Sequence, residues 1–454
     1  MQFQEDIFML RCLLLYVIIV FLTTIVASPT ISSVSGSPST TTINNSSTDS
    51  ISNISTSSNP STAQKGKNNL TSTFEITDQI KALIKDKIDS NKSNAAMAIG
   101  FIDPNGTQFY GYGKLSNSSN ATVNENTIFS IGSITKVFTT ILLADMVNKG
   151  LINLDDPIEK YLPSHVSVPQ FNGHKITVED LATHTSGLPE FPDNYCTSFF
   201  DLSKSGVQDT VQFRTDLFNC TKDYTFEQLY QALSNFTLTR EPGSKAEYSS
   251  FGIDLLGHIM TLKSNMSSFD ELVEHNILNV LGMNDTGFAL SDALKSRLAV
   301  GHFNGQELPT MNWSKPIDPS GALHSTTSDM LKFLSANMGL IKTKLDDAMQ
   351  ESHLIRHDTG RVLPNNLQAS GTNNIGGYVG LGWFIVTNYG HEVIWHNGAT
   401  IGGYNAYMAF NPITERGIVI LCSADTKDID ITRISFDQTD ELSSLIWNLL
   451  NQQR

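Results

Sequence analysis

Strand-forming segments lie at both ends of residues 74–454, and helix-forming segments lie between them. At the start, two apolar segments at 94–102 and 107–114 flank Asp103-Pro104-Asn105-Gly106, which has the composition of a hairpin turn. At the end come four more strand-like segments, at 381–389, 391–398, 404–412 and 416–424. Because a sheet must be covered by packed elements, this order predicts one α+β domain whose sheet is antiparallel at least in its C-terminal part.

The middle of this region is mainly helical. Apolar residues three or four positions apart predict helices at 133–149, 178–184, 225–234, 251–263, 268–279 and 327–339. Two amphipathic segments, 77–89 and 437–450, predict helices that flank the sheet. The helical middle would then form a second lobe, and a cleft between the lobes is a usual place for an active site.

An uncharged apolar run, 12–27, follows Arg11 near the start of the chain. Its length and the small residues Val26-Ala27-Ser28 suit a cleaved signal peptide, although the acidic residues 5–6 make a poor positive leader. With 7–10 added, the run reaches the length of a membrane anchor, provided that Arg11 extends to the interface. Both interpretations of 1–27, a signal peptide or an N-terminal membrane anchor, predict export.

Residues 28–73 have the composition of a disordered, flexible tether. Ser, Thr and Asn make up 25 of the 35 residues from 28 to 62, and no periodic apolar face occurs there. Thirteen Asn-X-Ser/Thr glycosylation acceptors, from Asn44 to Asn312, run through the tether and the domain. Together with an export signal, they predict a glycosylated protein that is displayed outside the cell.

The charge balance argues against a nucleic-acid binder. The 454-residue chain has a formal net charge of −15, whereas such proteins carry a basic surface. Hydrophobic residues reach 40% and charged residues only 17%, which suits a large packed core. No dinucleotide fingerprint, phosphate loop or Gly-x-Ser-x-Gly elbow occurs, so the sequence predicts no cofactor.

The cysteines agree with an exported protein. Cys196 and Cys220, 24 positions apart in a polar and aromatic insertion, either form a disulfide or remain two free thiols. A bridge of that length would contribute about 3 kcal/mol by restricting the unfolded chain. Cys422 lies in a strand-like apolar segment and is predicted to be a small core residue.

A Ser-x-x-Lys pair, Ser133 and Lys136, opens the helix predicted at 133–149. A spacing of three places both side chains on one face, about 4.5 Å apart along the axis. Serine is a weak nucleophile, and a lysine whose pKa is lowered by burial can accept its proton. Free N–H groups at a helix start could also stabilise a developing oxyanion. The pair alone is weak evidence, because an N-cap serine beside an exposed lysine gives the same pattern.

Two more motifs follow in order. Tyr248-Ser249-Ser250 lies 112 residues after the lysine, and His396 of Trp395-His396-Asn397-Gly398-Ala399 lies 148 residues after the tyrosine. Supporting stretches occur at 150–157, 181–189, 319–326 and 380–383. Over roughly 77–450 the chain resembles the serine penicillin-recognising family, the β-lactamase-related and penicillin-binding-protein-like proteins that include class C β-lactamases, D-alanyl-D-alanine carboxypeptidases and related esterases. The resemblance implies the β-lactamase/transpeptidase-like fold.

The resemblance also implies a role for each matching residue. Ser133 would be the acyl-enzyme nucleophile, Lys136 would take or relay its proton, and Tyr248 would act as base and activate water. A tyrosine needs a nearby cation for that, and Lys136 is the candidate. The backbone N–H groups of Ser133 and Ala399 would form the oxyanion hole. His396 at the sheet edge would line the pocket and, if protonated, bind a substrate carboxylate.

The substrate-binding residues that the resemblance implies are Ser250, His396, Asn397 and Gly398. Ser250 stands where the family commonly has an Asn whose amide holds the substrate, and His396 stands where many β-lactamases have Lys. A neutral His attracts a carboxylate less than Lys does. We therefore predict an exported serine acyl hydrolase for peptide, amide or ester substrates, of the D-alanyl-peptidase or esterase type. The alternatives are a true β-lactamase and a non-catalytic surface protein that senses ligands or assembles.

Three other histidines have simpler explanations. His353 and His357 are four residues apart and could hold a metal together on a helix, but the sequence suggests no third ligand. A solvated helix face, with no metal site, is the prediction for this pair. His184, within 181–189, is expected to make a structural hydrogen bond.

Overall fold

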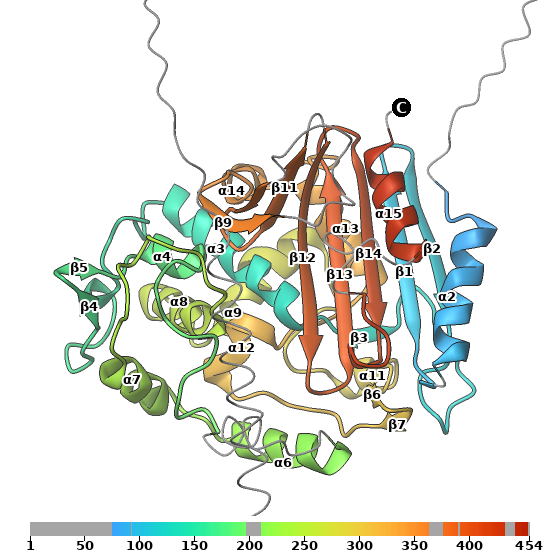
Figure 1. Ribbon diagram of the computed structural model, residues 1–454, viewed down its shortest axis with the longest axis horizontal. Helices are drawn as coiled ribbons and strands as arrows, with labels where there is room; N and C mark the ends of the chain where they lie inside the picture. The colour runs from blue at the N-terminus through green and yellow to red at the C-terminus, as the bar shows by residue number, and fades with distance from the viewer. Residues whose placement is uncertain are drawn as a thin grey trace, which may run out of the picture. The chain divides into compact units, whose positions relative to one another are not determined.

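The computed structural model of the 454-residue chain describes residues 75–91, 93–196, 210–362, 376–388, 391–431 and 441–452 (Figure 1). The leader and the tether, predicted over 1–27 and 28–73, lie outside these residues and stay predictions. Among the helices that are described, none is both long enough and apolar enough to cross a membrane.

An eight-stranded antiparallel sheet, in the order β2-β1-β14-β13-β12-β11-β10-β9, runs through the described domain (Figure 1). Its strands are β1 (Met97–Asp103), β2 (Gly106–Tyr112), β9 (His357–Val362), β10 (Gly376–Val379), β11 (Phe384–Asn388), β12 (His391–Thr400), β13 (Tyr404–Asn411) and β14 (Arg416–Cys422). Met97 in β1 pairs with Cys422 in β14. The two ends of the domain therefore meet in one antiparallel sheet, and the predicted fold class is confirmed.

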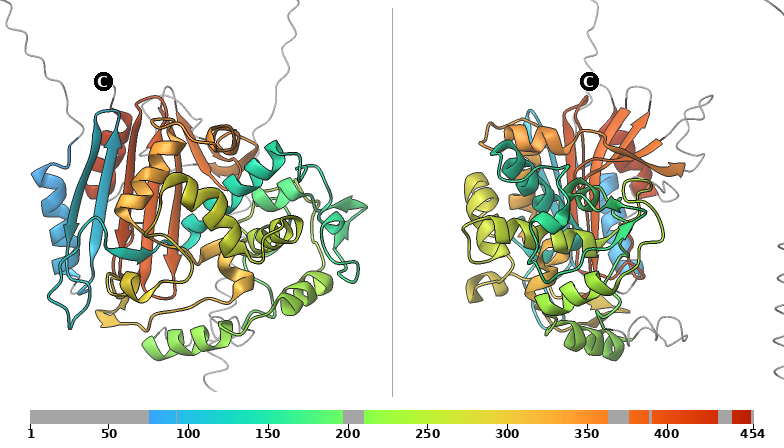
Figure 2. Two further views of the ribbon diagram at one scale, coloured as in Figure 1. Left: turned by 180° about the vertical axis from the view of Figure 1, so that it is seen from behind. Right: turned by 90° about the vertical axis from the view of Figure 1, so that its left-hand side faces the viewer.

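Both faces of the sheet are covered. Successive side chains of a strand point to opposite sides, so the apolar residues of the strands contribute to a buried cluster on each face. Helices α2 (Asp78–Ser90) and α15 (Glu441–Asn451) cover one face and form an apolar cluster with the strands. The helical region covers the other face, as the right-hand view of Figure 2 shows. A second, larger apolar cluster lies there. Every residue of β14 is consequently buried, which explains its continuous apolar sequence.

The helical region consists of several helices and three short ladders. Its helices are α3 (Thr135–Asn148), α4 (Val178–Ala182), α6 (Val211–Thr221), α7 (Phe226–Asn235), α8 (Ser250–Lys263), α9 (Phe269–Val273), α10 (Asn279–Leu281), α11 (Asp292–Lys295), α12 (Asp318–Gly321), α13 (Thr327–Asn337) and α14 (Asp346–Ser352). The ladders pair β3 (Ile128–Ser130) with β8 (His324–Thr326), β4 (Gln170–Phe171) with β5 (His174–Lys175), and β6 (His302–Phe303) with β7 (Gln306–Glu307).

Most predicted helices occur, and the differences have local causes. The helix predicted at 268–279 is α9, then a π-helical turn at Glu274–Leu278, then α10. Helix α6 lies in the polar insertion, where its weak apolar period gave no signal; Thr210 caps it by accepting a hydrogen bond from Phe213 N. Helix α12 has only four residues, too few for any period.

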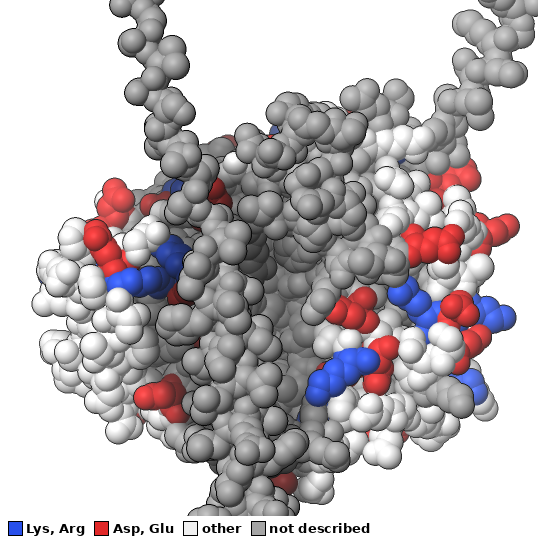
Figure 3. All heavy atoms as spheres, in the orientation of Figure 1, with Lys and Arg blue, Asp and Glu red and all other residues white. Residues whose placement is uncertain are grey.

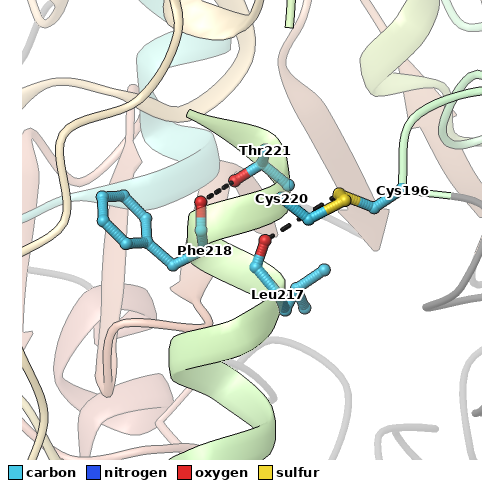
Figure 4. The surroundings of a disulfide bond; sticks show 5 residues. All are labelled: Cys196, Leu217, Phe218, Cys220 and Thr221. Carbon is cyan, nitrogen blue, oxygen red and sulfur yellow. Dashed lines mark hydrogen bonds between the residues drawn. A yellow bond between two sulfur atoms is a disulfide. The ribbon is translucent and has the colours of Figure 1, made fainter. Parts of the chain in front are cut away.

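The insertion is joined by a disulfide between Cys196 and Cys220 (Figure 4). The Cα atoms of the two cysteines are 5.8 Å apart. Helix α6, which carries Cys220, is also held to the body by a buried ion pair of 2.7 Å between Arg214 and Asp425. Cys422 is fully buried in β14, so its predicted place in the core is confirmed.

The expected solvated face at His353 and His357 is wrong. His353 ends helix α14, and its ring packs edge-on against Trp383 and Phe410. Its Nε2 lies 3.1 Å from Asn337 Oδ1, whereas His357 already belongs to strand β9. The helix ends too early to carry both residues, because Leu354 and the residues after it lead into the sheet.

Candidate active site

Ser133 lies in a 3-10 turn, Gly132–Ile134, between strand β3 and helix α3. The α-helix therefore begins at Thr135, two residues later than predicted. Gly132 has a φ of 51°, and a Cβ at this position would lie 2.9 Å from the backbone N of Ala399. Glycine alone suits both the left-handed backbone and the close approach, so the turn can press against strand β12.

A second glycine brings β12 against the same turn. A Cβ on Gly398 would lie 2.0 Å from Ile131 O and 3.0 Å from Ser133 N. The backbones of Ser133 and Ala399 are thereby adjacent, and both residues line one pocket. Two backbone N–H groups that converge on one point can stabilise a developing oxyanion.

Lys136 points from the first turn of α3 toward Ser133. Its Nζ lies 3.0 Å from Ser133 Oγ and donates to Ser320 O at 2.7 Å. The side chain is 1% exposed. Burial lowers the pKa of Lys136 to about 7, although the nearby carboxyls of Asp254 and Glu190 act in the opposite direction. At neutral pH the amine can therefore both accept and release a proton.

Tyr248 reaches the pair from the segment that leads into α8. The Lys136 Nζ lies 4.8 Å from the centroid of its ring, and its hydroxyl is a hydrogen-bond partner of Ser133. Burial raises the pKa of Tyr248, and this outweighs the lowering by Ser133. The lowered pKa expected from a Lys136 cation is therefore wrong, because the lysine is itself buried and only partly charged. Tyr248 holds its proton at neutral pH.

His184 packs against Tyr248 and binds the backbone of the next residue. The two rings lie 4.7 Å apart between centroids, and His184 Nδ1 accepts a hydrogen bond of 3.2 Å from Ser249 N. Burial, followed by the Lys136 charge, lowers the pKa of His184 to about 3, so the ring is neutral. The predicted structural hydrogen bond of His184 is confirmed, and it fixes the chain next to Tyr248.

His396 is fully buried in β12, an interior strand of the sheet. Its Nδ1 donates to Asn397 O at 2.6 Å, and the centroid of its ring lies 5.3 Å from that of the Phe384 ring. Burial, followed by the Lys136 charge, lowers the pKa of His396 to about 3. The expected place at a sheet edge is wrong, because β12 pairs with β11 on one side and with β13 on the other. The protonation on which binding of a substrate carboxylate depended is not favoured, because burial keeps the ring neutral. Asn397, the next residue, lines the pocket instead.

Asp254 is a neighbour of the site that the motifs do not reveal. It lies on α8, fully buried and close to Ser320, and neither of its carboxyl oxygens has a hydrogen-bond partner among the described residues. Burial raises the pKa of Asp254 well above its usual value, since the polar groups of Ser320 and the Lys136 charge compensate it only in part. Ser320 therefore stands between this carboxyl and Lys136, which donates to its carbonyl.

A cavity of about 520 Å³ opens beside Ser133, between β12 on one side and α8 on the other. Ser133, Lys136, Tyr248, Ser250, Asn397 and Ala399 all line it. Sequence reasoning missed a second group of lining residues, which are acidic or aromatic: Glu190, Phe191, Tyr195, Glu247, Trp313, Phe384 and Trp395. Trp395 belongs to the motif of His396, and four others directly adjoin a motif or a supporting stretch: Glu190, Phe191, Glu247 and Phe384. Nothing in the sequence pattern indicated Tyr195 and Trp313. Among the described residues, no group of three or more His, Cys, Asp or Glu is arranged to hold a metal ion.

A family model described as Beta-lactamase matches residues 80–435. The chain belongs to the beta-lactamase family. Among its relatives, the D-alanyl-D-alanine-carboxypeptidase/endopeptidase AmpH of Escherichia coli K12 is 27% identical over 368 residues, 80% of this chain and 87% of that protein. The beta-lactamase of Lysobacter lactamgenus is 27% identical over 357 residues, 72% of this chain and 81% of that one.

Solved structures of this family share the fold. A beta-lactamase/D-alanine carboxypeptidase from Yersinia pestis complexed with citrate has a TM-score of 0.62 and 22% identity, and covers 82% of this chain and 97% of its own. A class C beta lactamase from Rhodobacter sphaeroides has a TM-score of 0.62 and 19% identity, with 82% and 98% covered. The predicted family is therefore confirmed. Membership of the beta-lactamase family makes the chain a serine hydrolase rather than a non-catalytic surface protein.

Proposed function

We propose that this member of the beta-lactamase family forms an ester intermediate on Ser133 with peptide, amide or ester substrates. The observation that carries the proposal is the 3.0 Å distance between Lys136 Nζ and Ser133 Oγ. Since the pKa of Lys136 lies at about 7, a substantial fraction of the amine is uncharged at neutral pH. An uncharged amine at hydrogen-bond distance can take the proton that serine must lose to attack.

In the acylation step, Ser133 Oγ bonds to the substrate carbonyl carbon while Lys136 Nζ takes the serine proton. The carbonyl oxygen becomes an oxyanion, which the backbone N–H groups of Ser133 and Ala399 stabilise. When the carbonyl re-forms, the bond to the leaving group breaks. Removal of a single donor from such an arrangement typically costs about 10²–10³ in rate, so the contact between β12 and the serine turn matters.

Tyr248 is assigned to proton transfer as a donor. Its raised pKa keeps the hydroxyl protonated at neutral pH, and this hydroxyl is a hydrogen-bond partner of Ser133. The leaving group accepts the Tyr248 proton, and Lys136 then restores it. In deacylation, water attacks the ester carbon while Lys136 accepts its proton. The bond to Ser133 Oγ then breaks, Lys136 passes the proton to Oγ, and the acid is released. Tyr248 thus relays protons, whereas Lys136 is the base.

Peptide substrates are supported by the name of the Escherichia coli relative, a D-alanyl-D-alanine-carboxypeptidase/endopeptidase. Ser250 and Asn397 line the pocket and offer hydroxyl and amide groups to a substrate, while Gly398 lets β12 approach the serine turn. We expect slow turnover of β-lactams, because the buried, neutral His396 supplies no charge for the carboxylate that many of them carry.

The proposed place of action is outside the cytoplasm. The leader at 1–27, the Ser/Thr/Asn-rich segment and the glycosylation acceptors support an exported catalytic domain, 74–454, that is secreted or tethered to a membrane. The disulfide between Cys196 and Cys220 supports the same conclusion, because disulfides persist mainly in oxidising compartments.

The test is mass spectrometry of the intact protein after exposure to a fluorophosphonate, a fluorescent penicillin, D-alanyl peptides and simple esters. The wild type is expected to gain the mass of one acyl or phosphonyl group, and Ser133→Ala none. Ser250→Ala, which removes a second pocket hydroxyl, should still be labelled. Labelling of Ser133→Ala would overturn the nucleophile assignment, and nitrocefin hydrolysis faster than that of any ester or peptide would favour a true β-lactamase.

A further inference from the structure

The charged groups of the pocket are unequal in number. Among the described residues that line it, two are acidic, Glu190 and Glu247, and one is basic, Lys136. Lys136 is buried, and its amine is already held by Ser133 and Ser320. The lining therefore offers negative charge, and no free cation, to a molecule that approaches the serine.

The two carboxylates differ in their partners. Glu247 forms ion pairs with Arg240 at 3.0 Å and Lys245 at 2.5 Å, so its charge is compensated. The carboxylate of Glu190 makes no ion pair or hydrogen bond with any described residue. Its backbone is nevertheless fixed, because Glu190 O accepts hydrogen bonds from Ser250 N and Phe251 N at 3.0 and 3.1 Å.

Glu190 is close enough to the reacting groups to affect their charge. Its carboxylate raises the pKa of Lys136 and of Tyr248 by electrostatic interaction. Partial burial raises the pKa of Glu190 itself, more than the Lys136 charge lowers it. A second cation in the pocket would stabilise the partly buried charge of Glu190, since opposite charges attract more strongly where water is partly excluded. A carboxylate placed there would be repelled.

On this basis, which rests on the function proposed above, we propose that Glu190 is a specificity-determining residue that binds a protonated amine of the substrate. The enzyme then prefers substrates whose acyl part carries an ammonium group near the scissile carbonyl and discriminates against substrates whose acyl part carries a carboxylate. The aromatic side chains of Phe191 and Trp313 in the same lining suit the apolar part of such a donor and can also contact a cation with their ring faces.

The test uses three p-nitrophenyl esters with the same acyl chain, ending in an ammonium group, a neutral carboxamide or a carboxylate. The wild type should show the highest kcat/KM for the ammonium ester and the lowest for the carboxylate ester. Glu190→Gln should reduce the ammonium-to-carboxylate ratio about tenfold, which is the size of one charge-assisted contact. Glu190→Asp should retain part of the preference, and added salt should weaken the wild-type preference.

Glu247→Gln is the matched control, because it removes a pocket carboxylate that is already paired. It should change the ratio by less than about twofold, as expected for a compensated surface charge. A ratio that is equally insensitive to Glu190→Gln, or a wild-type preference for the carboxylate ester, would overturn the proposal. The neutral ester reports separately on the proposed function: if it forms no ester on Ser133, the hydrolase mechanism fails. Calorimetry with Ser133→Ala tests Glu190 without any turnover. It compares the binding of the two acids that correspond to the ammonium ester and the carboxylate ester.

Discussion

Helices α3 and α2 lie on opposite faces of one sheet and bury very different residues. Helix α2 buries three isoleucines at a spacing of four, Ile80, Ile84 and Ile88, and leaves its polar side to water. Helix α3 buries 12 of its 14 residues, and five of these are polar or charged: Thr135, Lys136, Thr139, Thr140 and Asp145. One helix covers the sheet, whereas the other is an interior element that carries the site.

The polar groups of α3 hold backbone from distant parts of the chain. Thr139 Oγ1 donates to Pro319 O at 2.7 Å, and Thr140 Oγ1 donates to Leu381 O at 2.8 Å. Lys136 Nζ donates in the same way to Ser320 O. Buried polar groups must be hydrogen-bonded, so these contacts satisfy carbonyls of helix α12 and of the segment between β10 and β11, and fix both on α3. The same burial that requires the contacts also lowers the pKa of Lys136.

The largest effect is expected from Lys136→Met, which removes the base but keeps most of the side-chain volume. Acylation of Ser133 should fall by about 10³-fold, within the range for loss of a general base. The wild-type rate should rise with pH through about 7, as Lys136 loses its proton, and the variant should lose this dependence. Stopped-flow acylation by a p-nitrophenyl ester measures both effects.

The same variant tests the cost of burying the lysine. The unfolded chain keeps the Lys136 proton up to a pH of about 10.5, whereas the folded chain loses it near a pH of about 7. Between these values the folded chain binds fewer protons, so the wild-type free energy of unfolding should rise with pH. Lys136→Met should therefore gain most over the wild type at pH 7 and below, and progressively less toward pH 10. Urea unfolding that shows a constant difference would contradict the lowered pKa.

The next effect separates the covering helix from the site. Ile84→Ala empties a fully buried position of α2 and should reduce the free energy of unfolding by about 2–4 kcal/mol. The acylation rate of the folded protein should stay within twofold of the wild type, since α2 and Ser133 lie on opposite faces of the sheet. Lys85→Ala, on the exposed side of the same helix, should change stability by less than about 0.5 kcal/mol. A large loss of acylation in Ile84→Ala would show that the two faces are coupled.

This contrast also explains what the sequence could predict. The spacing of four between the buried isoleucines of α2 is visible in the sequence and predicts an amphipathic outer helix. The strands were predicted separately, from apolar segments at the two ends of the domain. Helix α3 is predicted from apolar residues three or four positions apart, but its burial on all sides follows from elements far away in the chain, such as α8, α12 and α14, and no local period encodes that. The chemistry at Ser133, Lys136 and Tyr248 came from their order and spacing and from the family resemblance.

The properties of the site that depend on long-range packing could not be predicted. The charge of His396 follows from the helices and strands that cover β12, and a local motif contains no information about them. Glu190 and Asp254 approach Lys136 from separate elements, so their influence on its pKa appears only in three dimensions. A sequence motif thus indicates which groups can react, while the fold decides which of them are charged.

The smallest effect comes from two neighbouring threonines of α3 that make similar hydrogen bonds to different segments of the chain. Thr139→Val and Thr140→Val each leave a buried carbonyl without its donor, of Pro319 and Leu381 respectively, and each should cost about 1–2 kcal/mol of stability. Their effects on acylation should differ. Pro319 precedes Ser320, whose carbonyl holds Lys136, so Thr139→Val should slow acylation several-fold and shift its pH midpoint, while Thr140→Val should change neither. Equal rates for the two variants would mean that the Ser320 contact does not position the lysine.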